Sequence, residues 1–317
     1  MAIGVLVGAY RREPGPPEAL PMGRAALRLE AEGLPVIFGH EASAGRLRGL
    51  RPMPGGWRPV DAPIQGALDR FPSRRQPERY AALIDGLPGV PTFNGPRAID
   101  TCADKLRCAS VLTGPQPEVV SDPTTFADRL ASWGAAFHKP RYGSFGSGVR
   151  RVQPGDAVPP EAEGLEGPEP ALLQQAVPPP EDWAGVACRV LVQRDADGWW
   201  ADVPVARVSR EDAVVNAARG AEVRPLHALF PEATDAVRTA ALQVAMDLER
   251  ACGRVVEVGV DIVLDPEHQP WVIEVNVRPR GRLEAIAQHD PDWLEAHIEA
   301  CVRPLRAVAA LSGSPWP

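Results

Sequence analysis

One glycine-rich stretch in the middle of the chain restricts the folds that are open to it. Residues 138–149 read HKPRYGSFGSGV, so Lys139 precedes three glycines. A Walker A loop needs its lysine after the glycines, and a dinucleotide fingerprint needs a helix after them, but residues 149–152 (VRRV) have the pattern of a strand. Two antiparallel strands joined by a loop of small side chains remain. Such a loop can fold over a triphosphate with its backbone N–H groups as donors, although an ordinary Gly/Ser hairpin with an exposed lysine would give the same pattern.

A second informative segment lies nearer the C-terminus. Residues 259–279, GVDIVLDPEHQPWVIEVNVRP, read as two short strands joined by an Asp-Pro turn. If Leu264 pairs with Trp271, the same register places Asp261 opposite Glu274 on one face of the hairpin. A shift of one residue would turn Asp261 to the other face, so this prediction depends on the register.

The hairpin also carries the pattern of a metal site. Asn276 follows Glu274 by two residues and therefore points to the same face of its strand. Two facing carboxylates in a segment rich in valine and isoleucine repel each other unless a cation lies between them. Mg²⁺ uses one or two carboxylates together with substrate phosphates. The pattern predicts a magnesium site at Asp261, Glu274 and Asn276, with a solvated polar edge as the alternative.

The composition narrows the class of protein. The 317 residues carry a net charge of -7 with a pI near 5.5, which argues against a nucleic-acid partner. Five scattered cysteines without a C-x-x-C pair fit reduced thiols better than a disulfide framework or a zinc site. No apolar run approaches the length of a membrane span, and the first residues lack the pattern of a signal peptide. We therefore expect a cytoplasmic protein.

Hydrophobic periodicity predicts a mixed α/β chain. The first 38 residues read strand–helix–strand, which predicts a small doubly wound layer. Further helices are predicted at 104–113, 124–133, 234–250 and 291–311, and further strands at 135–139, 148–153, 171–177, 188–193, 199–209, 255–264 and 271–276. We expect three domains, with residues 1–97, 98–170 and 171–317.

Taken in order, these motifs resemble the ATP-grasp superfamily of the carboxylate–amine ligase type. The resemblance rests on Asp104-Lys105 at a helix start, HKPRYGSFGSGV, ALLQQAV, Arg189, Arg207 and the pattern Asp261…Glu274-Val-Asn276. The stretches WRPVDAPIQGALDRFPSRR (57–75) and TFNGPRAIDTCADK (92–105) are similar to the spore-coat-associated branch. The family implies an N-terminal doubly wound α/β domain, a small central lid domain and a C-terminal antiparallel-sheet domain.

The resemblance also implies an activity and a set of residues. The family's reaction phosphorylates a carboxylate with ATP and Mg²⁺ and then lets an amine displace phosphate, so that a C–N bond, ADP and phosphate form. Its partners would be a small-molecule or peptide carboxylate and an amine, with no nucleic acid or membrane, and the enzyme could be a homodimer. Carried over by position, the ATP-binding residues would be Lys105, Lys139, the lid residues Ser144, Phe145, Gly146, Ser147 and Gly148, the hinge residues Gln174, Gln175, Ala176 and Val177, and Glu181 or Asp182 at the ribose.

Several arginines fit roles in such a reaction. Arg189 and Arg207 lie on predicted strands, where inward-facing cations are uncommon, and with Lys139 they could stabilise a transferring phosphoryl group; facing outward they would simply be solvated. Arg278, Arg280 and Arg282 could bind an anionic substrate, or form a solvated basic turn. Asn216 and Arg219 are weaker candidates for substrate contacts.

Three positions depart from the family pattern. Ala187 stands where an acidic residue is usual, Gln175 where glutamate is usual, and Arg280 separates the proline from the glycine of the usual Asn-x-x-Pro-Gly. These departures concern the substrate more than the nucleotide. Two other functions share the platform: a small-molecule kinase, and a non-catalytic ATP-binding assembly protein.

Overall fold

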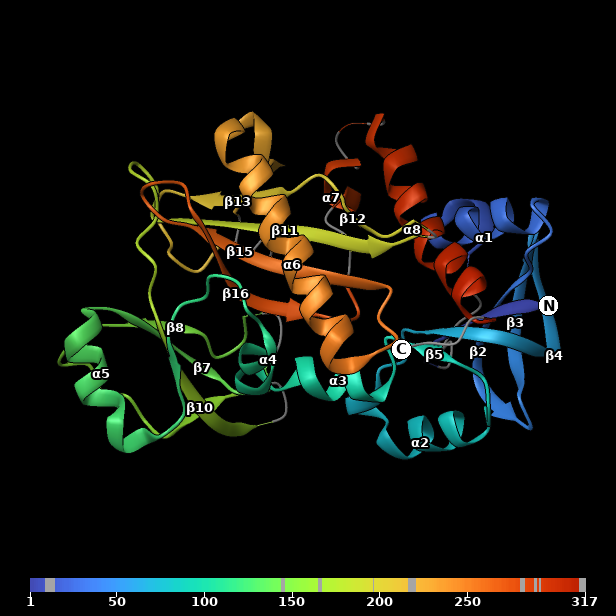
Figure 1. The fold of residues 1–317 in the computed structure, drawn as a ribbon, viewed down its shortest axis with the longest axis horizontal. Coiled ribbons are helices and arrows are strands. Elements are labelled where there is room, and N and C mark those ends of the chain that lie inside the picture. The colour runs from blue at the N-terminus through green and yellow to red at the C-terminus, as the bar shows by residue number, and fades with distance from the viewer. Residues whose placement is uncertain are drawn as a thin grey trace.

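Three β-sheets follow one another along the long axis of the part of the chain that the structure describes (Figure 1). The computed structural model describes residues 1–8, 15–143, 146–164, 167–195, 197–215, 221–279, 283–287, 290 and 292–313. The mixed α/β class is confirmed. None of the helices in these ranges is long and apolar enough to cross a membrane.

The N-terminal sheet begins as a parallel layer. Its strands are β1 (Ala2–Leu6), β2 (Val36–Ser43), β3 (Arg46–Met53), β4 (Gly56–Asp69) and β5 (Thr92–Phe93), with helices α1 (Pro21–Ala31) and α2 (Pro77–Asp85). Strand β1 pairs in parallel with β2 and β4, and β4 pairs in parallel with β5. The predicted strand–helix–strand start is therefore confirmed. The long β3–β4 hairpin was not predicted from the sequence.

The central sheet carries the glycine-rich loop. Helices α3 (Pro96–Ala103) and α4 (Lys105–Val111) lead into β6 (Val119–Val120), α5 (Phe126–Trp133), β7 (Ala136–Pro140), β8 (Arg150–Val152), β9 (Glu161–Glu163) and β10 (Pro168–Gln175). The strand order is β6-β10-β7-β8, and β9 pairs with β10. Phe126 and Leu130 of α5 pack on Ala136, Val152 and Leu173 of this sheet. The predicted domain boundary after residue 170 falls inside β10.

The C-terminal sheet is antiparallel, with the order β14-β13-β11-β15-β16. Its strands are β11 (Gly185–Arg194), β12 (Trp199–Ala201), β13 (Val205–Ser209), β14 (Glu222–Pro225), β15 (Glu257–Leu264) and β16 (Pro270–Asn276), and its helices are α6 (Thr234–Cys252), α7 (Leu283–Ala287) and α8 (Asp292–Leu311). The strand predicted at 199–209 is two strands, because residues 202–204 leave the ladder at Pro204. Both β12 and β13 pair with β11.

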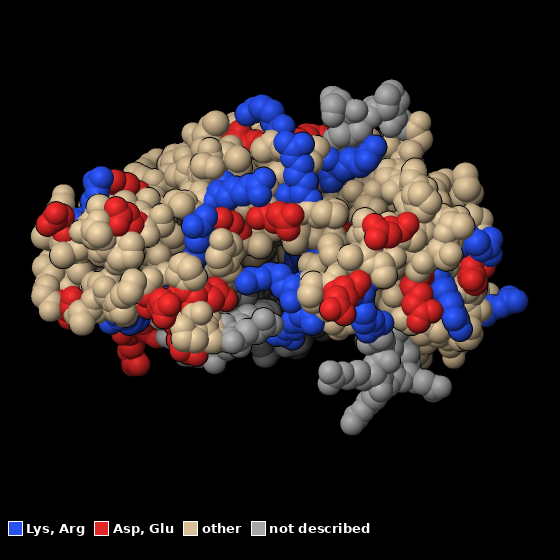
Figure 2. All heavy atoms as spheres, turned by 90° about the horizontal axis from the view of Figure 1, so that it is seen from below, with Lys and Arg blue, Asp and Glu red and all other residues tan. Residues whose placement is uncertain are grey.

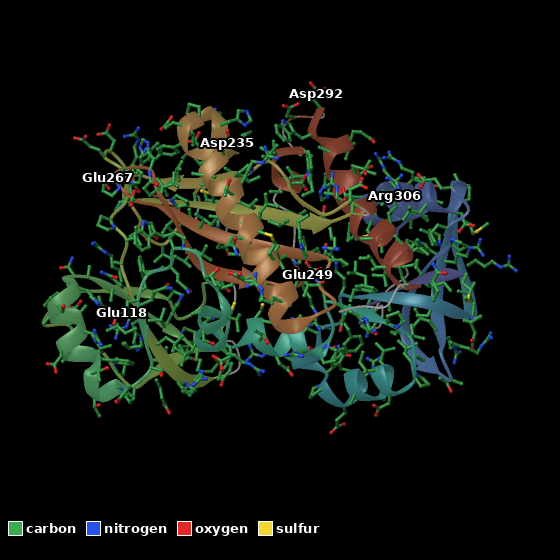
Figure 3. The ribbon with its side chains drawn as sticks, in the orientation of Figure 1. Glu118, Asp235, Glu249, Glu267, Asp292 and Arg306 are labelled. Carbon is green, nitrogen blue, oxygen red and sulfur yellow. The ribbon has the colours of Figure 1, made fainter. Side chains whose placement is uncertain are left out.

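Alternation along these strands gives the sheet one apolar and one polar face. Val190 of β11 and Val260 and Ile262 of β15 pack in the core that α6 covers. Helix α6 crosses this face in Figure 1, and Glu249 near its end accepts hydrogen bonds from Arg194 and the Trp199 indole (Figure 3). Successive side chains of a strand point to opposite faces. The residues between those valines and isoleucines therefore face away from α6, and they include the predicted site.

Buried polar contacts join the N-terminal and C-terminal sheets. The amide of Asn94 donates to the carbonyls of Glu257 and Val277, both at 2.6 Å, and its oxygen accepts from the Val256 N–H at 2.8 Å. Asn94 is fully buried and has a φ of 53°, a left-handed conformation that asparagine tolerates better than most residues. Arg70 donates to the Glu257 carboxylate at 2.6 Å. These contacts hold the two sheets in one arrangement.

Candidate active site

The glycine-rich stretch forms the hairpin that the sequence predicts. Strands β7 and β8 are antiparallel, with His138 opposite Arg150. Gly146 and Gly148 have φ angles of 71° and 67°, in the left-handed region that favours glycine. A Cβ at Gly148 would lie 1.9 Å from the Glu163 carbonyl oxygen, so this close approach needs glycine. Ser147 follows Gly146 in the turn, and Ser144 and Phe145 lie outside the described residues.

Two lysines line one cavity together with a proposed metal ligand. The cavity between α4, the central sheet and β16 is lined by Lys105, Lys139, Gln174 and Glu274, among other residues. The Lys139 ammonium donates to the Gln174 side-chain oxygen at 2.7 Å and to the Ile273 carbonyl at 3.5 Å. The Lys105 ammonium donates to the carbonyls of Pro140, at 3.2 Å, and Gly143. Both ammonium groups thus lie beside the start of the glycine-rich loop.

Burial lowers the pKa of both lysines. Burial first, and then the nearby Lys105 ammonium, lower the pKa of Lys139 to about 8, against the opposing effect of the Glu274 and Asp261 carboxylates. Burial also lowers the pKa of Lys105. Two buried cations side by side favour an anionic ligand, because its charge would offset their mutual repulsion and their loss of water.

We expect the affinity for Mg·ATP to fall as the pH rises through about 8, because a neutral Lys139 amine cannot pair with a phosphate. The fall should reach up to about tenfold per pH unit. The stability of the ligand-free protein should change with pH in the opposite direction. Between about pH 8 and the ordinary pKa range of lysine, Lys139 is protonated in the unfolded chain but neutral in the folded one. The free energy of unfolding therefore rises with pH in this range. Calorimetric titration from about pH 7 to 9.5 measures the affinity. Lys139→Met should remove the transition, and the same transition in that variant would contradict the assignment to Lys139.

Strands β15 and β16 place Asp261 opposite Glu274, but not through the predicted pairing at the turn. Leu264 lies opposite Pro270 and Val263 opposite Trp271, so the predicted pair of Leu264 with Trp271 is wrong. The register shifts between Asp261 and Ile262, where the extra residue on β16 forms a bulge. A bulge adds one residue to one strand and so changes which residues face each other beyond it. The predicted juxtaposition of Asp261 with Glu274 is therefore restored.

Asp261 is bound by both candidate catalytic arginines. Arg189 Nε donates to Asp261 Oδ1 at 2.7 Å while Arg189 Nη2 donates to Oδ2, and Arg207 Nη2 donates to Oδ1 at 2.9 Å. Asn276 Nδ2 lies 3.5 Å from Asp261 Oδ2. Both arginines therefore lie on the face of the sheet away from α6. Sequence reasoning treated them as phosphate-binding groups and missed that they pair with the proposed metal ligand.

The donor set fits a magnesium ion that is shared with phosphates. Asp261, Glu274 and Asn276 offer two carboxylates and an amide oxygen, the hard ligands that Mg²⁺ prefers. Within the described residues, no group of three or more His, Cys, Asp or Glu side chains could hold a metal. The Arg207 Nε is buried without a hydrogen-bond partner, which suits an incoming anionic oxygen. A cation here would need oxygens from its ligand, as in a metal–nucleotide complex.

Of the predicted hinge and ribose residues, Gln174 lines this cavity and the others are outside its lining. Gln175 is the last residue of β10, and its N–H donates to the Glu118 carbonyl at 2.9 Å. The Ala176 N–H donates to the Ala135 carbonyl at 3.1 Å. Asp182 follows Glu181 in a turn with a φ of 70°. The roles assigned to Gln175, Ala176, Val177, Glu181 and Asp182 stay predictions.

Arg278 is held by the N-terminal sheet. Its guanidinium donates to Asp69 Oδ1 at 3.2 Å and to Ser73 Oγ at 3.1 Å, and it lies over the Tyr80 ring at 5.8 Å. Burial raises the pKa of Asp69, and the Arg278 charge opposes that rise. Arg278 is therefore already paired with a carboxylate. The other substrate candidates, Arg280, Arg282, Asn216 and Arg219, lie outside the described residues.

A further ion pair at the loop was missed by sequence reasoning. Arg141 makes a two-pronged contact with Asp104, at 2.8 and 2.6 Å, and Asp104 also accepts from the backbone N–H groups of Leu106 and Arg107 at the start of α4. The pair lowers the pKa of Asp104. The ion pair links Asp104, which precedes Lys105, to Arg141, which follows Pro140. The sequence Asp104-Lys105 at a helix start indicates that Asp104 caps the helix, but no sequence pattern indicates that Arg141 pairs with Asp104.

Comparisons with known proteins agree with this architecture. A family model for YheC/D-like ATP-grasp proteins matches residues 162–299. No curated protein matches the sequence. Among solved structures, D-alanyl-alanine synthetase A from Vibrio cholerae is 17% identical with a TM-score of 0.56, over 95% of this chain and 98% of that one. D-cycloserine synthetase DcsG is 15% identical with a TM-score of 0.58, over 96% and 99%.

A third similar structure was solved with ligands. The ATP-grasp ligase PsnB, in complex with a phosphomimetic variant of its minimal precursor, Mg and ADP, is 17% identical with a TM-score of 0.56, over 95% of this chain and 97% of that one. At such identities the likeness concerns the fold. The resemblance to the spore-coat branch stays a prediction. The chain has the ATP-grasp fold.

Proposed function

We propose that this protein is an ATP-dependent carboxylate–amine ligase that acts through an acyl phosphate. One observation carries the proposal. Lys105 and Lys139 from the central part of the chain and Glu274 from the C-terminal sheet line one cavity, and Asp261 faces Glu274 across the hairpin. Two lysines that could bind phosphates therefore lie close to two carboxylates that could bind a metal, between the central and the C-terminal sheets. A metal–nucleotide complex satisfies both charge sets at once.

Each residue has a distinct part in the proposed reaction. Lys105 and Lys139 hold phosphate oxygens, and the N–H groups of the loop around Gly146 and Gly148 cover them. Asp261, Glu274 and Asn276 would hold Mg²⁺, which supplies charge compensation between the phosphates when Mg·ATP is bound. Arg189 and Arg207 carry fixed positive charge on the same face of the sheet.

The proposed reaction has two steps, and every bond that forms is matched by one that breaks. An oxygen of the substrate carboxylate forms a bond to the γ-phosphorus as the bond to ADP breaks, giving an acyl phosphate. The amine substrate then forms the C–N bond as phosphate leaves. Arg189 and Arg207 are placed to offset charge on the phosphoryl group during the first step, because preorganised cations stabilise charge that develops in a transition state.

The test is incubation of the full chain with Mg·ATP and pools of carboxylates and amines. We expect ADP release that requires one member of each pool, with a product lighter by one water than the two substrates together. Lys139→Met should lower this rate by at least about a hundredfold, because removing a single electrostatic contact to a transition state costs that much in other enzymes. A phosphorylated product without condensation would identify a kinase. Mg·ATP binding without turnover of any pool would identify an ATP-binding assembly protein.

A further inference from the structure

The Asp261 carboxylate, a proposed metal ligand, is fully occupied by hydrogen-bond donors in this structure. Its Oδ1 accepts from Arg189 Nε at 2.7 Å and from Arg207 Nη2 at 2.9 Å. Its Oδ2 accepts from Arg189 Nη2, and Asn276 Nδ2 lies 3.5 Å from the same oxygen. An ionised carboxylate has about four acceptor sites. These four N–H donors therefore take up the lone pairs with which Asp261 would bind a metal.

Arg207 has a further donor that Asp261 does not satisfy. This arginine is 7% exposed, and its Nε is buried without a hydrogen-bond partner. A buried donor without a partner costs free energy, which an incoming anionic oxygen would recover. Guanidinium groups bind phosphate in the same two-pronged geometry as carboxylate. Phosphate oxygens can therefore replace Asp261 as the partner of both arginines.

The charges around the proposed metal site disfavour a metal ion on its own. Lys105, Lys139 and Glu274 line the cavity, and Asp261, which lies opposite Glu274, holds the two arginines. Burial opposes a rise in the pKa of Arg189, but the charges of Asp261 and, more weakly, Glu274 raise it above its usual value. Both carboxylates therefore act on this arginine.

The balance of these charges is positive at neutral pH, because four cationic side chains lie around two carboxylates. Figure 2 shows a similar mixture at the surface, where Lys and Arg side chains gather around a hollow near the middle of the face seen from below, with Asp and Glu side chains beside them. A divalent cation alone adds to the positive excess at the site. The metal–nucleotide complex remains anionic, so it lowers the excess.

We infer that Arg189 and Arg207 form an interlock at the metal site, an inference that rests on the proposed function. Without phosphates, the two guanidinium groups hold Asp261 and block its oxygens. The phosphates of the nucleotide accept the guanidinium donors in place of Asp261, whose carboxylate then serves the metal together with Glu274. The site therefore takes up Mg²⁺ only together with the nucleotide. Each of the two raises the affinity for the other by the same factor.

The first experiment measures metal binding to the full chain without nucleotide, with Mn²⁺ as a paramagnetic probe and the loss of its free-ion resonance signal as the readout. We expect Arg207→Met to bind Mn²⁺ at least about fivefold more tightly than the wild type, the lower end of the usual coupling between two sites. The reason is that Asp261 regains acceptor sites, and Arg189→Met should act in the same direction. The matched control, Arg224→Met, replaces an exposed arginine of β14 that pairs with Glu222, and it should keep the wild-type affinity.

The second experiment tests whether Asp261 leaves the arginines when the nucleotide binds. Calorimetry measures the affinity for the β,γ-imido analogue of ATP, once with Mg²⁺ and once with EDTA. Asp261→Asn keeps an oxygen that can accept from the arginines but loses the negative charge. With Mg²⁺ this variant should lose most of the gain in affinity that the metal gives the wild type. With EDTA it should bind the analogue at least as tightly as the wild type, because its arginines no longer have a counter-charge.

Several results would overturn the interlock while Mg·ATP still stabilises the protein. One is an unchanged Mn²⁺ affinity in both arginine variants, and another is a gain that persists when Glu274→Ala is added to them. A full effect of Mg²⁺ in Asp261→Asn would show that the arginines stay paired with Asp261 in the loaded protein. Equally tight binding of Mn²⁺ to the wild type with and without the analogue would decide against the interlock without any variant.

Failure of Mg·ATP to stabilise the wild type would instead remove the proposed function itself. Circular dichroism spectra and cooperative melting establish that each variant is folded before its affinity is compared with that of the wild type.

Discussion

Glu274→Ala is expected to abolish the stabilisation of the fold by Mg·ATP. A ligand that binds only the folded protein at about 100 times its dissociation constant adds about 2.7 kcal/mol to the free energy of unfolding. Glu274 lines the cavity beside both lysines and faces Asp261, so its removal leaves the proposed metal with one carboxylate from the protein. Denaturant unfolding with and without Mg·ATP measures the gain in wild type and in the variant.

The control for this prediction lies on the same hairpin. Glu267 is exposed in the turn between β15 and β16 (Figure 3) and is not among the residues that line the cavity. Glu267→Ala should keep the full gain in stability from Mg·ATP. In wild type, EDTA should remove most of that gain, because the carboxylates then face the phosphates without a cation. A full gain in Glu274→Ala would show that the metal is held elsewhere.

Asp261→Ala is expected to lower the free energy of unfolding by about 3–5 kcal/mol in the absence of any ligand, the range measured when one partner of a buried ion pair is removed. Asp261 is 5% exposed and Arg207 is 7% exposed, and Arg189 shares the same carboxylate. The variant leaves two guanidinium groups buried without their counter-ion. Urea unfolding of the ligand-free protein measures the loss.

Two control variants separate the effect of breaking the ion pair from the effect of removing any aspartate. Asp235→Ala, at an exposed position in the first turn of α6 (Figure 3), should cost no more than about 0.5 kcal/mol. The triple replacement Asp261→Leu with Arg189→Met and Arg207→Met should recover most of the loss, because an apolar cluster of similar volume carries no desolvation penalty. A loss for Asp261→Ala no greater than that for Asp235→Ala would contradict the buried pair.

The register of the metal hairpin shows how far the sequence could lead. Alternation of valine and isoleucine with Asp261 and Glu274 was enough to predict that these carboxylates face each other. It could not predict the bulge, because one extra residue leaves the same alternation on either side of it. The predicted pairing at the turn was one residue off, and the bulge restored the register at Asp261.

The partners of the arginines could not be read from the sequence. Alternation predicts which face Arg189 and Arg207 occupy, but it does not reveal that one carboxylate is shared by both. Arg278 lies 209 residues from Asp69 along the chain, and only the folded arrangement of the two sheets brings them together. Contacts between distant segments depend on topology, whereas helix and strand patterns depend on neighbours a few residues apart.

The contacts of Asn94, Arg70 and Asp69 have a mechanical consequence. They bind the N-terminal and C-terminal sheets into one block, and α8 packs Ile298, Val302 and Leu305 into the N-terminal core as well. Between this block and the central sheet, the contact at the Lys139 ammonium is a single long hydrogen bond to the Ile273 carbonyl. We therefore expect nucleotide binding to move the central sheet relative to the other two sheets, a closure of the hinge type.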